Sequence, residues 1–144
     1  MKRIIISLLM FSVIMLNAQT DDLPQKVNDA FYSKYPKARD VIWKTDSKIY
    51  EIEFYQSGDM FTALFDKDGN WIETGVVITD EELPVNFQQE LNKKYPDAEI
   101  VYSEKVVTSN NISFFRVFIE TQDTSLIIKS SPDGKISEVN QDYN

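Results

Sequence analysis

The sequence predicts an α+β protein built from two tandem units, each a helix followed by four antiparallel strands. Three observations predict this fold. Residues 23–38 and 83–98 repeat one another, with six of sixteen aligned positions identical. Apolar residues recur at helical spacing inside each copy, and after each copy the pattern changes to strand-like alternation between short turn sequences. We expect the eight strands to form one continuous sheet with both helices on one face.

The two copies of the repeat predict amphipathic helices. In the first copy the apolar face comprises Leu23, Val27, Ala30 and Phe31, and in the second it comprises Leu83, Phe87, Leu91 and Tyr95. Pro24 and Pro84 are expected in the first helical turns, where proline is tolerated. Pro36 and Pro96 end the helices, because the residue before a proline avoids helical backbone angles.

Alternating segments predict four strands after each helix. The first set covers residues 40–44, 50–55, 61–65 and 70–78, and the second covers residues 99–107, 112–120, 125–130 and 135–139. Gly58 is expected to supply a positive φ angle in a hairpin turn. The two helix segments align at an offset of sixty residues, but residues 66–75 align with residues 131–140 at an offset of sixty-five. The five extra residues are therefore placed in the hairpin at 108–111.

The repeat has a physical reason in the size of each unit. A unit of about 60 residues buries only a marginal core. Two units, residues 19–79 and 80–144, gain stability by joining into one domain.

The N-terminus resembles an export signal. Lys2 and Arg3 precede an apolar run from Ile4 to Leu16, and Ala18 fits a cleavage site, which gives a signal peptide at residues 1–18. A retained membrane anchor is the alternative, but the run is shorter than the roughly 20 residues that span a bilayer. Cleavage predicts a periplasmic or secreted protein with no transmembrane segment.

Composition excludes several classes of function. The chain has no Cys and no His, which excludes disulfides, thiol proteases, Ser-His-Asp hydrolases and ordinary zinc enzymes. Cleavage of the signal peptide removes the positive charges of Lys2 and Arg3, which lowers the net charge of the chain from −8 to −10. This acidity argues against nucleic acid as a partner. We predict no catalytic residues, no metal and no cofactor.

The motifs resemble the PepSY-like, beta-lactamase-inhibitor-like exported proteins of bacteria. The first copy matches that pattern at Leu23, Pro24, Tyr35, Pro36, Trp43, Tyr50, Phe65, Asp66, Asp68, Gly69 and Trp71. In the second copy Ser103, Ser131 and Ile136 replace the equivalents of Trp43, Asp66 and Trp71. The resemblance implies a repeat of helix and antiparallel sheet, residence outside the cytoplasm, and binding rather than catalysis.

Two acidic motifs have competing interpretations. Residues 66–70, DKDGN, begin like a calcium loop, but the positions that need Gly and Glu are Trp71 and Val77, so we favour a tight turn. Glu51, Glu53 and Glu73 could present paired carboxylates, as glycosidases require. We favour a solvated sheet face, because short connections leave no loops to build a cleft.

The aromatic residues divide into core candidates and a candidate surface. The core candidates are Trp43, Tyr50, Phe54, Phe61, Phe65 and Trp71. The strand at 112–120 is apolar on both faces, so the face that carries Phe114, Arg116 and Phe118 is expected to form an exposed apolar patch, unless turns or a second protomer cover it. The candidate partner surface comprises Glu51, Glu53, Tyr55, Phe114, Arg116 and Phe118.

The sequence therefore predicts an exported, non-catalytic protein that binds a protein or peptide on its sheet face. By family analogy this role includes inhibition of a periplasmic or secreted hydrolase. The alternatives are a structural or envelope-stress component without a specific ligand, and an enzyme that uses carboxylates alone.

Overall fold

A computed structural model describes residues 22–138 of the chain. The predicted signal peptide at residues 1–18 lies outside the described residues, as does Val139 at the end of the last predicted strand. In chain order the elements are α1 (Gln25–Lys34), β1 (Arg39–Thr45), β2 (Ile49–Gln56), β3 (Asp59–Asp66), β4 (Trp71–Ile78), the 3-10 helix η1 (Asp80–Glu82), α2 (Phe87–Lys94), β5 (Glu99–Thr108), β6 (Ser113–Glu120), β7 (Ser125–Ser130) and β8 (Ile136–Glu138).

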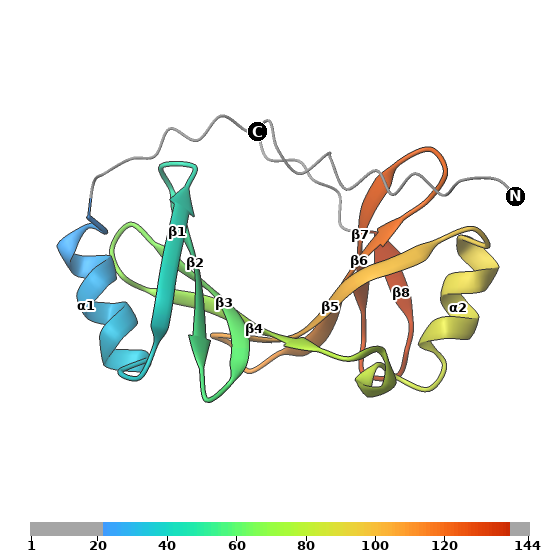
Figure 1. Cartoon of the computed structure of the whole chain (residues 1–144), viewed down its shortest axis with the longest axis horizontal. Coiled ribbons are helices and arrows are strands. Elements are labelled where there is room, and N and C mark those ends of the chain that lie inside the picture. The colour runs from blue at the N-terminus through green and yellow to red at the C-terminus, as the bar shows by residue number, and fades with distance from the viewer. Residues whose placement is uncertain (1–21, 139–144) are drawn as a thin grey trace, which may run out of the picture.

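The strands form one antiparallel sheet in the order β1 to β8, so every strand pairs with its neighbour in the sequence. Figure 1 shows α1 and α2 at opposite ends of the molecule, with the sheet curving between them. The prediction of an α+β protein with one antiparallel sheet and two helices is confirmed.

The strand register places both helices on the same face of the sheet. Phe61, Val76, Lys105 and Phe115 lie opposite one another across β3 to β6, and paired residues of an antiparallel ladder share a face. Phe61 packs against the cluster that contains the buried residues of α1. Val117, two residues after Phe115 and so on the same side, belongs to the cluster of α2. Neither helix of residues 22–138 lies on the opposite side of the sheet, which we call the helix-free face.

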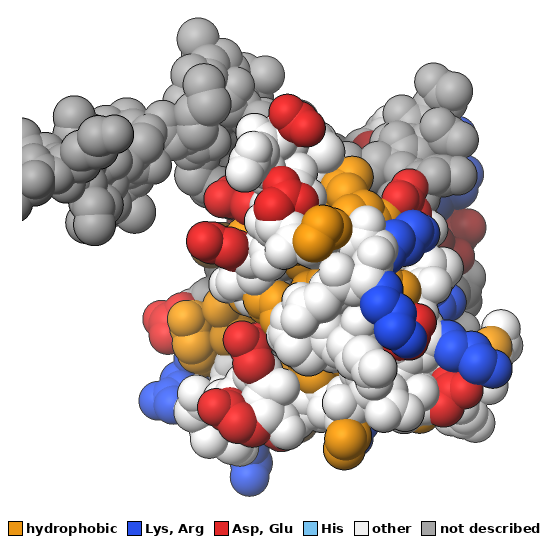
Figure 2. Space-filling view, turned by 90° about the vertical axis from the view of Figure 1, so that its right-hand side faces the viewer, with side chains coloured by type: hydrophobic (Ala, Val, Ile, Leu, Met, Phe, Trp, Pro, Cys, Tyr) orange, Lys and Arg blue, Asp and Glu red, His pale blue; other side chains and the backbone are white. Residues whose placement is uncertain are grey.

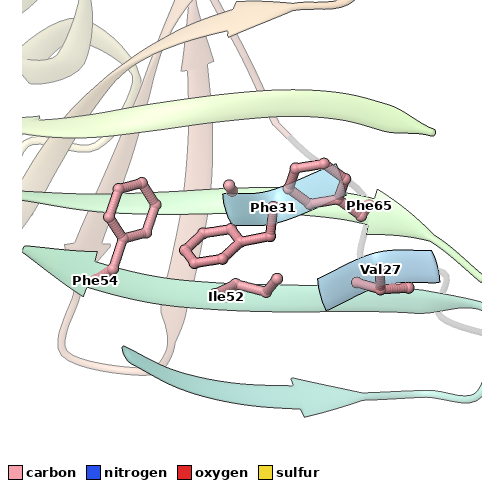
Figure 3. Packing of buried hydrophobic residues seen from close by; sticks show 6 residues of the cluster. Val27, Phe31, Ile52, Phe54 and Phe65 are labelled. Atoms are coloured by element: carbon pink, nitrogen blue, oxygen red, sulfur yellow. The ribbon is translucent and has the colours of Figure 1, made fainter. Parts of the chain in front are cut away.

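The first core forms between α1 and strands β2 and β3. Figure 3 shows Val27 and Phe31 of α1 beside Ile52, Phe54 and Phe65. The ring centroids of Phe31 and Phe54 are 5.1 Å apart in an edge-to-face arrangement, which aromatic rings favour. All of the predicted core aromatics belong to this cluster or pack against it: Trp43, Tyr50, Phe54, Phe61, Phe65 and Trp71.

The second core is poorer in aromatic residues. Its buried members are Phe87, Leu91, Val117, Ile119 and Ile128. Ser103 pairs with Val117 as Trp43 pairs with Ile52 in the first half, so a small hydroxyl stands where the first half has an indole. Ser103 is fully buried, and its Oγ has no hydrogen-bond partner in residues 22–138.

The registers also locate the extra residues of the second half. The pair Trp43–Ile52 spans nine residues of sequence, whereas the pair Ser103–Val117 spans fourteen. The difference of five falls in the β5–β6 hairpin, as the offsets of the repeat predict.

Helix α2 begins later than predicted. Pro84 lies outside it, because Asn86 is the residue that precedes the first helical position, and Val85 is 98% exposed. The backbone N–H of Phe87 donates to the carbonyl of Pro84 at 2.8 Å, which is a turn rather than a helical bond. Both helices do end before the second proline, at Lys34 and Lys94.

The predicted turns are confirmed at their glycines. Gly58 has φ +98°, and Gly69 has φ +84° in the turn after β3. Asp66 accepts hydrogen bonds from the backbone N–H groups of Asp68 and Asn70 at 2.8 and 2.9 Å, which is the local bonding expected of a tight turn. Gly69 also lies against α1, where an added Cβ would be 2.6 Å from the carbonyl oxygen of Lys26.

Candidate binding surface on the helix-free face

All six residues predicted for a partner surface lie on the helix-free face. Their register shows this, because Phe114 pairs with Val106 and Arg116 with Glu104, out of phase with the residues that meet α2. They form two groups, with Glu51, Glu53 and Tyr55 on β2 and with Phe114, Arg116 and Phe118 on β6. Three strands separate the groups, which corresponds to about 19 Å along the sheet.

Arg116 occupies the centre of this face in a buried ion cluster. Its Nη1 donates to Oε2 of Glu104 at 3.1 Å, and its Nη2 donates to Glu73. The side chains of Arg116, Glu73 and Glu104 are only 20%, 13% and 4% exposed. Burial raises the pKa of Glu104, an effect that Arg116 opposes. Gly75 makes room for this carboxylate, since a Cβ there would be 3.1 Å from Glu104 Oε2.

Phe114 does not form the exposed apolar patch expected from the sequence. It is on the predicted face but only 7% exposed. The Nζ of Lys129 lies 4.1 Å from its ring centroid, and the guanidinium carbon of Arg116 lies at 5.6 Å. Two cations therefore cover this ring, and the expectation of an exposed Phe114 is wrong.

Phe118 instead pairs with an aromatic residue that the sequence analysis did not select. Tyr102 on β5 lies opposite Phe118, with ring centroids 4.1 Å apart and planes inclined by 14°. Tyr102 is 40% exposed. Sequence analysis also missed Glu104. Tyr102, Glu104 and Val106 alternate along β5, which indicates that they share one face of the strand. The register of the β5–β6 hairpin is needed to place them opposite Phe118, Arg116 and Phe114.

The carboxylates of β2 influence a tyrosine on β5. Burial raises the pKa of Tyr102 above its ordinary range, and the carboxylates of Glu104, Glu51 and Glu53 raise it further. Glu51 and Glu53 lie three strands away in the sheet order, yet their charges act on this hydroxyl. We call Tyr102, Phe118, Glu51 and Glu53 the acidic–aromatic surface.

Two of the three acids considered for hydrolysis are held in ion pairs. Glu73 binds Arg116, and Glu51 binds Lys44 at 2.9 Å, so of the three acids considered for hydrolysis only Glu53 has no ion pair within residues 22–138. A glycosidase needs two carboxyl groups available to one substrate, which this arrangement does not provide. Within the same residues, no group of three or more acidic side chains is placed to hold a metal ion.

A separate groove lies near the start of α2, where the segment before that helix meets β5 and β6. It has a volume of about 430 Å³ and is lined by Glu82, Pro84, Lys105, Ser113, Phe114, Phe115 and Pro132. Figure 2 views the α2 end of the molecule, where hydrophobic side chains show in small patches between charged side chains of both signs. The groove contains none of the acidic–aromatic surface.

The fold and this surface define an α+β protein whose antiparallel sheet is covered by helices on one side and lined by aromatic and charged residues on the other. The model of the family described as "Putative beta-lactamase-inhibitor-like, PepSY-like" matches residues 15–64 and 56–136. The chain belongs to this family, as its motifs indicated. No curated protein matches the sequence.

Solved structures of similar fold come from Bacteroides. A DUF2874 family protein from Bacteroides uniformis is 23% identical, with a TM-score of 0.68 over 84% of this chain and 93% of that one. A protein titled "putative periplasmic" from Bacteroides eggerthii is 18% identical, with a TM-score of 0.69 over 86% and 94%. A BLIP-like protein from Bacteroides fragilis is 20% identical, with a TM-score of 0.65 over 88% and 94%. These likenesses establish the fold.

Proposed function

We propose that this chain is an exported, non-catalytic protein that binds a protein or peptide partner through the helix-free face of its sheet. The observation that carries the proposal is the Tyr102–Phe118 pair, which is stacked and partly exposed on a face that no helix of residues 22–138 covers. Rigid aromatic side chains supply much of the binding energy of protein interfaces, because they bury large areas at little entropic cost.

Other features of the face support a protein partner. Tyr55 is 44% exposed and Ile42 is 62% exposed, so β1 and β2 also carry exposed apolar side chains. The buried Arg116 cluster holds the middle of the face in a fixed arrangement, which lowers the entropic cost of binding.

Export and partner class rest on the N-terminus and the family. The sequence of residues 1–18 has the pattern of a cleavable signal, which would place the protein in the periplasm or outside the cell. Across residues 22–138, no helix is both long and apolar enough to cross a membrane. By analogy with the family description, the partner class we favour is a periplasmic or secreted hydrolase that the protein inhibits. We attribute the repeated order of helix and four strands to a tandem duplication of units 19–79 and 80–144.

The test is a crosslinked capture from the protein's own envelope fraction. The mature chain is compared with a Tyr102→Ser/Phe118→Ser variant. Phe114 is left intact because it is buried. The matched control is Tyr32→Ser/Val85→Ser, two side chains that are 43% and 98% exposed and lie off the helix-free face.

One stoichiometric partner retained by the control and lost by the surface variant supports the proposal. Equal capture by all three proteins would show that the face is not the binding site. Absence of any partner would favour the structural or envelope-stress role. Hydrolysis of a glycan panel by the wild type, abolished by Glu53→Gln, would point to an enzyme.

A further inference from the structure

We infer that two copies of this chain pair through the free edge of β1, in antiparallel orientation about a two-fold axis at Ile42, so that their two sheets join into one. The inference goes beyond the proposed function and does not depend on it, because the edge of β1 and the helix-free face are different surfaces. It follows from the openness of this edge and from the order of the side chains along it.

The two edges of the sheet are protected to different degrees. β1 and β8 are the outermost strands. The described part of β8 has three residues, and so short an edge strand is a poor template for a further strand. β1 has seven residues, and no strand of residues 22–138 pairs with its outer side. The outer side of β1 therefore offers backbone N–H and C=O groups to another strand.

A bulge sets the point at which pairing with another strand can begin. Arg39 pairs with Tyr55 and Ile42 pairs with Glu53, so three steps along β1 match two steps along β2. Asp40 lies within this interval and has φ +52°. Because a bulge interrupts an edge, regular pairing with a second copy is confined to the segment that follows Asp40.

The segment after the bulge is apolar on both faces of the sheet. Ile42 is 62% exposed and lies on the helix-free face, since it pairs with Glu53. Val41 and Trp43 pack against the first core on the helix-bearing face, and both stay partly exposed. Cross-strand pairs of β-branched and aromatic side chains stabilise a sheet, so this segment suits a further strand.

The order of the side chains makes this segment complementary to itself. When two antiparallel copies are centred on Ile42, each Ile42 meets its counterpart, and Val41 meets Trp43 of the second copy on the same face. Asp40 then comes next to Lys44 of the second copy. Every contact away from the axis occurs twice in a two-fold interface, so two ion pairs flank the centre. Centring one residue later would set Lys44 opposite Ile42 and lose both pairs.

The remaining charges near the edge are compatible with this register. Lys44 binds Glu51 at 2.9 Å within the chain, but its side chain is 69% exposed, and an ammonium group has three donors. Arg39 precedes the paired segment and Asp46 follows it. In an antiparallel pair, the end that carries Arg39 meets the end of the second copy that carries Asp46, so like charges are kept apart along β1.

The affinity should be modest, for two reasons. A strand edge buries less area than the roughly 1,200 Å² of a standard stable interface. After signal cleavage each chain also has a net charge of −10, so the copies repel one another at long range. We expect a reversible dimer of the mature protein with a dissociation constant on the order of 100 μM, measured by sedimentation velocity between about 10 μM and about 1 mM.

A single substitution locates the interface. Ile42→Lys sets two ammonium groups opposite one another on the axis, so the dimer should weaken at least about tenfold. The exposure of Ile42 leaves the core of the chain unchanged. The matched control is Ile112→Lys, which adds the same charge at a side chain that is 56% exposed in the β5–β6 hairpin, and it should dimerise like the wild type.

A pair of charge reversals tests the register. Asp40→Lys and Lys44→Glu each bring like charges together across the axis, so each variant alone should dimerise about three- to tenfold more weakly. An equimolar mixture should recover the affinity of the wild type, because every cation of one variant then faces a carboxylate of the other. Urea unfolding of each variant verifies that the fold is retained.

Each other outcome overturns the inference. A wild type that stays monomeric at about 1 mM would leave the edge of β1 to a strand of a different protein. A dimer that Ile42→Lys does not weaken would place the interface elsewhere. Absence of recovery on mixing would reject the register centred on Ile42. The proposed function fails separately, because capture of a partner through Tyr102 and Phe118 does not require the edge of β1.

Discussion

The guanidinium of Arg116 binds the carboxylate of Glu104 at 3.1 Å in the middle of the helix-free face, where the Glu104 side chain is 4% exposed. The two residues are directly opposite in the β5–β6 ladder. Because Arg116 also binds Glu73 on β4, one side chain joins three adjacent strands at the point where the first half of the sheet meets the second.

Replacement of Arg116 by methionine should lower the free energy of unfolding by about 3–5 kcal/mol, because it leaves a buried carboxylate without its cation. Urea unfolding at pH 7 measures the change. The control is Lys26→Met, which removes an exposed pair with Asp68 and should cost no more than about 1 kcal/mol. A loss from Arg116→Met as small as that of the control would show that the cluster contributes little to stability.

Glu104→Gln should change how stability depends on pH. Burial raises the pKa of Glu104 above its ordinary value of 4.5, so the folded protein holds this proton more tightly than the unfolded chain. The resulting contribution is fully present below pH 4.5 and is lost as the pH rises through the folded pKa. Urea unfolding between pH 4 and pH 7 should therefore show that the free energy of unfolding of the wild type rises, relative to that of Glu104→Gln, as the pH falls.

Glu138 gives the matched comparison with the opposite sign. The Tyr95 hydroxyl, and then Lys94, lower the pKa of Glu138 below 4.5, so its contribution is present above pH 4.5 and is lost as the pH falls through the folded pKa. The wild type should lose its advantage over Glu138→Gln on acidification. Identical pH profiles for both variants would contradict these assignments.

Ser103→Ala should raise the free energy of unfolding by about 1 kcal/mol, because it removes a buried hydroxyl that has no hydrogen-bond partner in the described part of the chain. Ser130→Ala is the control, since Ser130 is equally buried but its hydroxyl donates to the carbonyl of Ser131 at 3.1 Å. The midpoints of thermal and urea unfolding should rise for Ser103→Ala and fall for Ser130→Ala. Equal destabilisation would indicate that Ser103 has a partner after all.

Gly69→Ala should destabilise the protein more than Gly58→Ala. Both glycines have positive φ, where a Cβ costs about 1–2 kcal/mol. At Gly69 the new Cβ would also be 2.6 Å from the carbonyl oxygen of Lys26, whereas nothing lies within 4 Å at Gly58. Urea unfolding should separate the variants by at least about 1 kcal/mol, and equal losses would show that the turn can move away from α1.

The sequence by itself determined the two α-helices, the eight strands, their order and the aromatic residues of the first core, but not the 3-10 helix η1 or the start of α2. The periods of 3.6 and 2, the prolines after each helix and the glycines in the turns act locally, so they are readable without knowledge of distant contacts. The alternation of Phe114, Arg116 and Phe118 also fixed their common face, because successive side chains of a strand point to opposite sides.

Only the tertiary structure decided what that face presents. Phe114 is covered because Lys129, on the neighbouring strand, reaches its ring, and Tyr102 is stacked because the hairpin register sets it opposite Phe118. The charge of Glu51 on β2 raises the pKa of Tyr102 on β5, a relationship between two strands that the sequence pattern does not reveal. Register is set by how each strand pairs with the next one, and the twist of the sheet accumulates over all eight strands, so the alternation within a single strand does not specify them.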